Sequence, residues 1–451
     1  MNKALPMQLN EFVDEDKTRQ IVEDMLKIAK KMGASQGEVS FMSAVGLNVT
    51  VRLNEVETLE FNRDKGVGIT VYTDQRKGSA STTDIKMESL TATVKAAIDL
   101  AKLTEKDSYA GLAESEKMAW EAKGLDLYHP WNLGVEEAIE IAKNCEKHAL
   151  SFDKRIHNSE GATLSSTQAY HIYGNSHGFS GFYPATRHSL SCTVIAQDLQ
   201  GMVRDYEFTV SRKESLLEQS EIIGKKAAEK TLSRLMAKKL PTQRIPILFH
   251  ASIASSLISH LIAGLSGGRL FRRSSFLLES LNTKIFQDFM HIYEVPHICG
   301  GLGSAPFDSD GVATFSKDIV KEGIIQNYIL STYSARKLGL ATTANAGGVH
   351  NLFVKSGNED FQGLLKMMGR GLVVTELMGP GVNLVTGDYS RGASGFWVEN
   401  GEIQYPVHEV TIAGNLLNMF KQIVAVGNDV DTRGTMQTGS LLIEEMTLAG
   451  I

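Results

Sequence analysis

The sequence predicts an α+β protein of two domains. Residues 1–240 are expected to combine helices with antiparallel or mixed sheets, and residues 241–451 to form a β-rich domain with a few helices. Three observations support this prediction. Apolar residues recur at helical spacing near the start, several segments alternate with a period of two, and the second half is rich in glycine around one strongly apolar helix.

The first half begins with a helical pattern that gives way to strands. Apolar residues recur at helical spacing up to Gly33, which stands where a C-terminal cap belongs. Alternation of apolar and polar residues then predicts strands over 47–53 and 67–71. Turn signals at 62–66 and 77–78 predict that these strands are short and form an antiparallel meander.

The rest of the first half repeats the mixture of helices and strands. Helices are predicted over 88–104 and 134–150, followed by a second β-rich stretch over 160–212. A further helix over 219–238 leads to Leu240–Pro241, and the domain boundary is expected there because proline cannot continue a helix.

The second half starts with a short apolar strand over 245–249 and an apolar helix over 251–266. Beyond it the chain is glycine-rich, and small residues allow tight turns and close approach of the backbone to a ligand. A hairpin is predicted about Asn400–Gly401, followed by a strand that leads into a helix.

Composition excludes several classes of protein. The 451 residues carry a formal net charge of −6 without a concentrated basic surface, so direct nucleic-acid binding is not expected. Three cysteines do not make a disulfide framework and fit a reducing compartment. The first residues lack the apolar run of a signal peptide, and no stretch approaches the roughly 18 apolar residues of a membrane span. These features predict a cytoplasmic protein that does not enter a membrane.

The helix over 251–266 is the place to look for a catalytic metal. Zinc proteases set two histidines and a glutamate on one helix, so that the ligands converge and the glutamate acts as a base. Here Leu261 follows His260, the next turn offers Gly264 and Leu265, and no carboxylate lies on the helix. His260 is therefore predicted to be a core or interface residue, with no metal bound on this helix.

Three other motifs resemble catalytic or binding signatures only in part. His297 and Cys299 could supply two metal ligands, but no second pair completes a structural site. Ser266 lies in a G-x-S-x-G pattern that ends a helix, where a nucleophile would require a strand-to-helix elbow. The glycines of 300–306 lack the Lys-Ser/Thr pair of a phosphate loop. Arg336 and Lys337 are expected to form surface charge pairs.

Two glycine-rich segments, 346–351 and 386–395, are candidates for a substrate groove because bare backbone lets a peptide come close. Turn chemistry explains the same residues equally well, so both interpretations stand. The candidate groove residues are His350, Asp388, Tyr389, Ser390 and Arg391.

Longer motifs carry a family resemblance over essentially the whole chain. They include GNSHGFSGFYPATRHSLSC at 174–192, RRSSFLLESL at 272–281, GLVVTELMGPGVN at 371–383 and TGDYSRGASGFWVENGEIQYPV at 386–407. The chain resembles the PmbA, or TldE, branch of the TldD/PmbA family. The resemblance implies two related subunits, TldD and TldE, that assemble into a heterodimeric zinc metalloprotease acting on unfolded peptides. Family members are also described as modulators of DNA gyrase.

The metal site that the resemblance implies does not carry over to this chain. Zinc is held in the TldD-type subunit by an HExxxH helix and a cysteine near the C-terminus. His260 falls at the first histidine, while Leu261 replaces the glutamate, Leu265 replaces the second histidine, and 427–446 contains no cysteine. The resemblance therefore implies a partner subunit with no catalytic residue and no cofactor of its own, zinc being in the TldD-type partner.

The missing ligands also predict the geometry of the helix. Residues five apart on an ideal α-helix diverge by about 140°, so an HExxxH pair needs a local distortion such as a π-bulge. A chain that binds no metal has no need of it, and we expect a regular helix over 251–265.

Two other functions stay open. The chain could be a free-standing hydrolase that uses residues such as Ser390 or His350, or a regulator that binds DNA gyrase. A homodimer is a further expectation for the isolated chain, because closed symmetric pairs are common.

Overall fold

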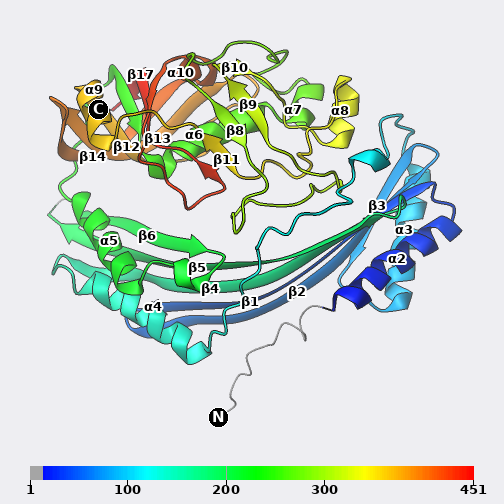
Figure 1. The fold of residues 1–451 in the computed structure, drawn as a ribbon. Coiled ribbons are helices and arrows are strands. Elements are labelled where there is room, and N and C mark those ends of the chain that lie inside the picture. Colours follow the sequence, from blue (N-terminus) through cyan, green and yellow to red (C-terminus); the bar gives the residue numbers. More distant parts are fainter. Residues whose placement is uncertain (1–13, 200, 451) are drawn as a thin grey trace.

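The computed structural model describes residues 14–199 and 201–450. The N-terminal segment for which no signal peptide is predicted lies mostly outside the described residues. The first half is built on one curved antiparallel sheet in the order β3-β2-β1-β4-β5-β6 (Figure 1). Its strands are β1 (Gln36–Arg52), β2 (Glu55–Thr73), β3 (Arg76–Thr82), β4 (Ile156–Asn175), β5 (Ser180–Asp198) and β6 (Gly201–Ser211). The second half of the chain lies in the hollow of this sheet.

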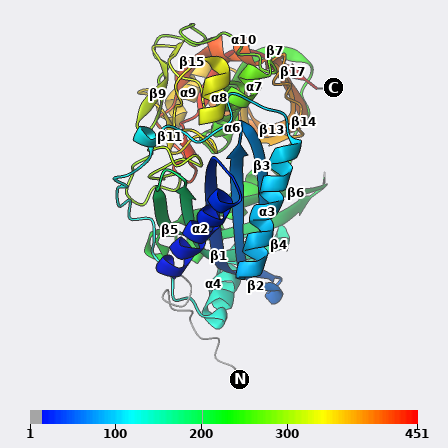
Figure 2. The same ribbon diagram turned by 90° about the vertical axis from the view of Figure 1, so that its right-hand side faces the viewer.

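Four helices cover the other face of the sheet, in two pairs. They are α2 (Glu15–Lys31), α3 (Met87–Leu103), α4 (Val135–Leu150) and α5 (Ser220–Ser233). The apolar stripes of α2 and α3 pack on one end of the sheet, where Figure 2 shows them side by side, and those of α4 and α5 pack on the other end. The order helix, three strands, helix thus occurs twice along the chain.

The prediction of short strands separated by a turn at 62–66 is wrong. β2 runs unbroken through these residues and pairs with β1 from Glu55 to Tyr72. The turns lie instead at Leu53–Asn54 and Asp74–Gln75, where all four residues have positive φ, as two-residue hairpin loops require. Residues 59–65 are exposed on both faces of the sheet. Their sequence therefore lacks the apolar–polar alternation of a half-buried strand and resembles that of a turn.

The second half contains a six-stranded sheet in the order β14-β13-β12-β7-β17-β15, which closes on itself because β14 also pairs with β17. The strands are β7 (Gln243–Phe249), β12 (Gly371–Met378), β13 (Asp388–Glu399), β14 (Glu402–Asn415), β15 (Ile423–Val426) and β17 (Leu441–Ala449). The predicted hairpin at Asn400–Gly401 is confirmed as the turn between β13 and β14, with φ of 55° and 75°.

Smaller elements complete this half around a large apolar core. A second sheet has the order β10-β9-β8-β11-β16, and short helices pack around both sheets. The remaining elements are α6 (Ala251–Gly264), α7 (Gly267–Phe271), β8 (Ile292–Glu294), β9 (Lys317–Lys321), β10 (Ile324–Ile325), α8 (Thr332–Leu338), β11 (Leu352–Val354), α9 (Phe361–Met368), α10 (Leu416–Lys421) and β16 (Met436–Gln437).

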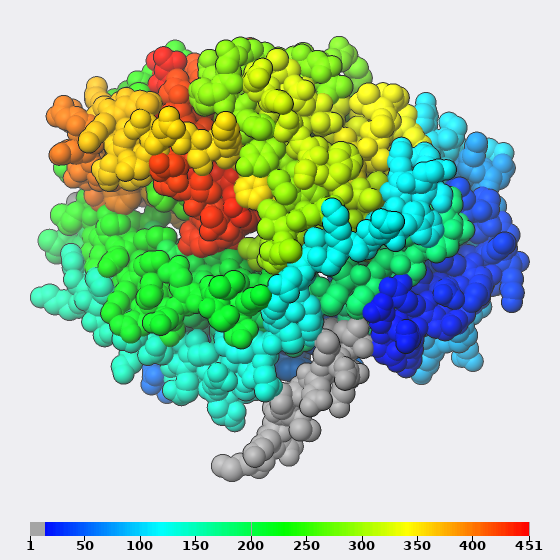
Figure 3. Space-filling view, viewed as in Figure 1, coloured from blue at the N-terminus to red at the C-terminus, as the bar shows by residue number. Residues whose placement is uncertain are grey.

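An extended segment, residues 104–134, lies across the junction of the two halves, as the cyan surface in Figure 3 shows. Arg336 donates to the carbonyl oxygens of Gly111 and Leu112 and pairs with Glu114 at 2.9 Å. Lys337 pairs with Asp107 at 3.1 Å. The charge pairs predicted for Arg336 and Lys337 are confirmed, and they fasten this segment onto the second half.

The α+β class with a β-rich second half is confirmed. Within the described residues, no helix combines the length and apolar character that a membrane crossing requires.

Candidate functional site

A groove of about 860 Å³ lies between the two halves of the chain. Its volume falls in the range of roughly 300–1,000 Å³ that ligand pockets occupy. One wall comes from β6 and α5, and the other from α6, β12, β13 and the segment 433–436. The groove is therefore assembled by the packing of the second half into the curved sheet.

Helix α6 presents a polar stripe to the groove and an apolar face to the core. The stripe consists of Ser252, Ser255, Ser256 and Ser259, which follow one another at helical spacing. On the opposite side Leu257, Leu261 and Leu265 are fully buried in the large core. Sequence reasoning missed these serines, although their spacing is the signal that could have revealed them.

Leu261 and Leu265, which stand where the resemblance implies the glutamate base and the second histidine ligand, lie inside this core. Leu261 and Leu265 have no exposed surface, and the N–H of Leu265 donates to the carbonyl oxygen of Leu261 at 2.9 Å. That bond has α-helical spacing, and the regular helix predicted over 251–265 is confirmed as α6 with Leu265 as its C-cap. The donor set here is a single imidazole, which does not fit a zinc ion. Within the described residues, no three His, Cys, Asp or Glu side chains lie close enough to hold a metal ion.

His260 lies beside Tyr389 at the edge of the core, with ring centroids 6.1 Å apart in an edge-to-face arrangement. In the described part of the chain, neither His260 Nε2 nor the Tyr389 hydroxyl has a hydrogen-bond partner. Burial lowers the pKa of His260, and the nearby Arg391 cation lowers it further. Burial also raises the pKa of Tyr389 to about 12. Both groups are thus neutral at pH 7.

Most charged groups of the groove are paired. Arg234 pairs with Asp205 at 2.5 Å and with Glu376 at 2.6 Å. Glu207 pairs with Lys230 and Arg433, and although burial opposes ionisation, these cations hold the pKa of Glu207 below its usual value. The positive charge of each of these groove residues is therefore compensated from within the chain.

Arg391 is the exception. It donates to the carbonyl oxygens of Gly379 at 3.0 Å and Leu377 at 3.3 Å, and among the described residues no carboxylate lies within ion-pair distance. These two bonds use Nε and one terminal nitrogen, and a guanidinium has five N–H donors in all. Arg391 therefore retains donors and an uncompensated charge at the groove wall.

The groove also exposes a length of strand edge. β7 pairs with β12 only from Leu372 to Val374, because β7 ends at Phe249 and the chain enters α6. A bulge then places Thr375 between the paired residues Val374 and Glu376. From Thr375 onward β12 pairs with β13 alone, so its other edge is open where Thr375, Glu376 and Leu377 line the groove.

Only one of the five predicted groove residues lines this groove. Residues 388–395 are not a loop, as predicted, but part of strand β13, whose alternation exposes Asp388 and Ser390, buries Tyr389 and places Arg391 at the groove. A glycine-rich strand resembles a loop in sequence because glycine is compatible with both extended and turn backbone conformations. The structure thus brings Arg391 to the groove and leaves Asp388 and Ser390 outside it.

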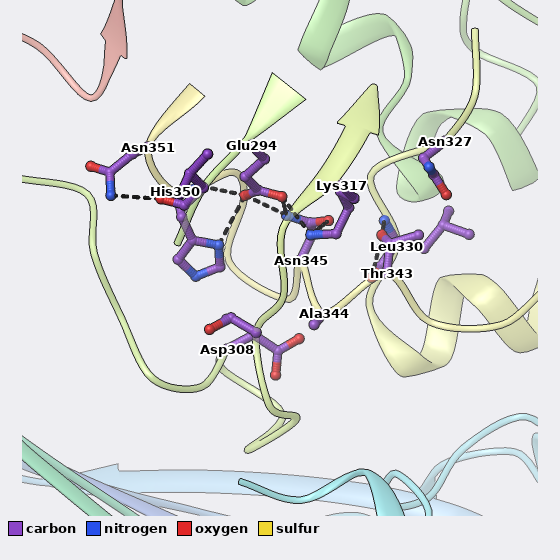
Figure 4. A network of polar contacts seen from close by, with 12 residues as sticks. Glu294, Asp308, Lys317, Asn327, Leu330, Thr343, Ala344, Asn345, His350 and Asn351 are labelled. Carbon is purple, nitrogen blue, oxygen red and sulfur yellow. Dashed lines mark hydrogen bonds and ion pairs between the residues drawn. The ribbon is translucent and has the colours of Figure 1, made fainter. Parts of the chain in front are cut away.

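His350 belongs to a buried polar network elsewhere (Figure 4). Its Nδ1 lies 2.9 Å from Glu294, which also accepts from Lys317 and Asn345. Burial would raise the pKa of Glu294, but His350 and Lys317 hold it at about 2. Asp308 lies nearby and accepts three backbone N–H bonds, while burial and Asp310 raise its pKa to about 7.

The other His and Cys candidates lie neither at the groove nor in the network around Glu294. His291 bonds to Asp318, His297 bonds to Thr314, and Cys299 is exposed. All three lie outside the helices and strands, and the two histidines are half-buried.

Taken together, fold and site describe a two-part α+β protein with a groove between its halves, and the serine stripe of helix α6 forms part of one wall of that groove. The chain belongs to the PmbA/TldD metallopeptidase family. Family models match three stretches: PmbA/TldA metallopeptidase domain 1 at 37–101, the central domain at 128–235 and the C-terminal domain at 242–450. β1 to β6 form one sheet across the first two of these stretches.

Relatives of known name extend over the whole chain. It is 49% identical to "Metalloprotease PmbA" of Escherichia coli O157:H7, over 99% of this chain and 100% of the relative. It is 46% identical to "Metalloprotease PmbA homolog" of Haemophilus influenzae, over 97% of each chain. The match to "Metalloprotease TldD homolog" of Buchnera aphidicola is 20% identical over 87% of this chain and 85% of that one.

Two solved structures share the fold. One, from Bacteroides thetaiotaomicron, is described as a modulator of DNA gyrase, with a TM-score of 0.92 and 29% identity over 97% of this chain and 100% of that one. The other is TldE from Thermococcus kodakarensis, with a TM-score of 0.83 and 21% identity over 95% of this chain and 100% of that one. The family predicted from the sequence motifs is thus confirmed.

Proposed function

We propose that this chain is the metal-free subunit of a two-subunit zinc metalloprotease that degrades or trims unfolded peptides, with the zinc in a TldD-type partner. The observation that carries the proposal is the burial of Leu261 and Leu265 in the core. The resemblance sets a carboxylate base and an imidazole ligand at those positions. Without them this chain has neither the ligands nor the base that zinc-assisted hydrolysis requires.

In this proposal the groove binds the substrate backbone. The open edge of β12 offers main-chain groups to an extended peptide, and such bonds give affinity that does not depend on side-chain sequence. Unfolded chains satisfy this requirement because their backbone groups are free. The uncompensated charge of Arg391 would bind a carbonyl oxygen or a carboxylate of the peptide.

Reconstitution of activity tests this assignment. Hydrolysis of an unstructured fluorogenic peptide is measured with this chain alone, a TldD-type subunit alone and both together, each with and without a zinc chelator. Cleavage is expected only from the mixture and only without chelator, and metal analysis is expected to find zinc in the TldD-type subunit. Chelator-sensitive cleavage by this chain alone would overturn the proposal.

One variant locates the substrate on this chain within the same assay. Arg391→Met in the mixture is expected to raise KM about tenfold, the loss of one charged hydrogen bond at about 1.4 kcal/mol, with little change in kcat. Arg244→Met is the matched control, because Arg244 is exposed and far along β7 from the groove. Equal KM values for the two variants would remove Arg391 from the substrate groove.

A further inference from the structure

The groove between the two halves has two ends with different surroundings. At the N-terminal end of α6, burial lowers the pKa of His250, and the nearby cations Lys230 and Arg433 lower it further. Arg391 lies at the other end, beside His260. His260 is ten residues beyond His250, which is about 15 Å along the helix.

The two ends also differ in charge. Lys230 pairs with Glu207, and Arg433 pairs with Asp431, both at 2.6 Å, so the cations of the first end are compensated. Arg391 donates only to carbonyl oxygens within residues 14–199 and 201–450. The second end is therefore positive, and it attracts a carboxylate and repels the ammonium group of a peptide N-terminus.

The open edge of β12 ends at the same place as this charge. β12 stops at Met378, and Gly379 has a φ of 77°, a left-handed conformation that turns the chain. The carbonyl oxygens of Leu377 and Gly379 already accept from Arg391. A peptide strand that pairs with the open edge thus loses its partner just beyond Leu377, where the uncompensated guanidinium lies.

The direction of the sheet agrees with the charge. β7 pairs with β12 in parallel, and the open edge, Thr375–Leu377, begins where β7 ends. Its three residues span about 10 Å, enough for the last few residues of an extended peptide. A peptide that lies in line with β7 and runs in the same direction has its C-terminus at the Arg391 end.

The rest of the lining suits the backbone and apolar side chains of a peptide. Thr375 Oγ1 is buried and has no hydrogen-bond partner in the described part of the chain. On the opposite wall the rings of Tyr206 and Phe208 are stacked with centroids 6.2 Å apart. Tyr206 is 53% exposed and Ile403 is 43% exposed, so the groove offers apolar surface that a peptide side chain can cover.

We infer that the Arg391 end of the groove binds the C-terminal carboxylate of a peptide whose last residues pair with the open edge of β12. The guanidinium donates from the N–H groups that its bonds to Leu377 and Gly379 leave free. The chain then recognises peptide ends and not internal stretches. This inference rests on the proposed function in one respect, the assignment of the groove to peptides.

Binding of two peptides to the full chain tests the inference. Both consist of alanine and leucine followed by a final phenylalanine, without acidic residues, and carry an N-terminal dansyl group, which has no carboxylate. One ends in a free acid and the other in an amide. Fluorescence anisotropy at pH 7 is expected to give a dissociation constant at least about tenfold lower for the acid, because the amide cannot form a charge-assisted pair with Arg391.

A third peptide separates the two sources of a carboxylate. It ends in the amide and has an aspartate in its middle, and it is expected to bind as weakly as the plain amide. If it binds as tightly as the free acid, the groove accepts any carboxylate, and the recognition of peptide ends is overturned.

Three variants locate the preference for the acid. Arg391→Met is expected to bind acid and amide equally, and Arg391→Lys to retain part of the preference, because an ammonium group keeps the charge without the planar fork. Thr375→Val is the matched control within the groove, since it removes a hydroxyl that does not carry charge, and its ratio of acid to amide affinity is expected to equal that of the parent. Unchanged melting temperatures show that the variants fold.

Equal affinities of the parent chain for acid and amide would overturn the inference and leave the proposed function standing. A preference that survives Arg391→Met would overturn it too, as would one that Thr375→Val abolishes or an acid that does not bind at about 1 mM. An Arg391-dependent preference for the acid, combined with no cleavage in the reconstituted mixture, gives the reverse result: the carboxylate site stands and the proposed function fails.

Discussion

The polar cluster around Glu294 and the polar groups around His260 differ in how far their hydrogen bonds are satisfied. Glu294 is fully buried and accepts from His350, Lys317 and Asn345. Near the groove, by contrast, three buried polar atoms have no hydrogen-bond partner within the described residues: His260 Nε2, the Tyr389 hydroxyl and Thr375 Oγ1. Of these residues, Thr375 lines the groove, and His260 and Tyr389 lie behind it at the edge of the core. A satisfied buried cluster stabilises a fold, whereas a buried polar atom without a partner costs the free energy of its desolvation.

The comparison assigns different roles to two histidines that the sequence does not distinguish. His350 lies just before β11 and bonds to the buried carboxylate of Glu294 at the end of β8, so its contribution is to stability. His260 lies against Tyr389 and near Arg391, on the helix that lines the groove. Changes at the Glu294 cluster are therefore expected to reduce the free energy of unfolding, whereas the loss of the His260 imidazole is expected to leave it level.

The largest effect is expected from Glu294→Ala. The change leaves Lys317 buried without its carboxylate, and breaking a buried ion pair from one side costs about 3–5 kcal/mol. Urea unfolding followed by circular dichroism measures the loss. Glu279→Ala is the control, because the pair of Glu279 with Arg273 is exposed and worth little. A loss below about 1 kcal/mol for Glu294→Ala would remove the structural role of this cluster.

Asp308 gives the same cluster a signature in pH. Burial and Asp310 raise its pKa to about 7 in the folded chain, against about 3.9 for an unfolded aspartate. Because the folded pKa is raised, the contribution of Asp308 is complete below pH 4 and is lost as the pH rises to 7. The free energy of unfolding should therefore fall across this window by up to roughly 4 kcal/mol.

Asp308→Asn supplies the control for that slope. The amide oxygen can still accept the two backbone N–H bonds that Oδ1 receives from Asp310 and Val312, while the bond from Ala346 to Oδ2 is lost. Because the amide does not titrate, the fall between pH 4 and 7 should disappear. Glu294, whose pKa is lowered to about 2, acts in a different window, since its contribution is lost only as the pH falls below about 4. A slope that persists in Asp308→Asn would assign it to another group.

Much of the architecture could be predicted from the sequence, because periodicity reports burial directly. The stripes of α2, α3 and α4 and the hairpin at Asn400–Gly401 follow from local chemistry. The length of β2 does not, because residues 59–65 have no buried face and the strand exists through pairing with β1. Similarly, residues 388–395 form a strand only because β12 and β14 flank them.

The site was predictable in its chemistry but not in its location. The apolar character of Leu261 and Leu265 can be read from the sequence itself, and it is the basis of the proposed metal-free role. The groove, however, is formed by β6, α6 and β12, which lie far apart along the chain, and no local pattern reports that meeting. Of the polar residues on glycine-rich segments, only Arg391 reached it, since alternation along β13 decides which side chains face the groove.

The smallest effects come from exchanging the two histidines for leucine, which tests the opening comparison most directly. His350→Leu removes a hydrogen bond to a buried carboxylate and is expected to cost about 1.5–3 kcal/mol. His260→Leu removes a buried ring nitrogen that has no partner in the described chain, so the free energy of unfolding should stay level or rise by up to about 1 kcal/mol. Urea unfolding of both variants at pH 7 gives the difference. Equal losses would mean that His260 is as well bonded as His350, and the contrast between the two histidines would fail.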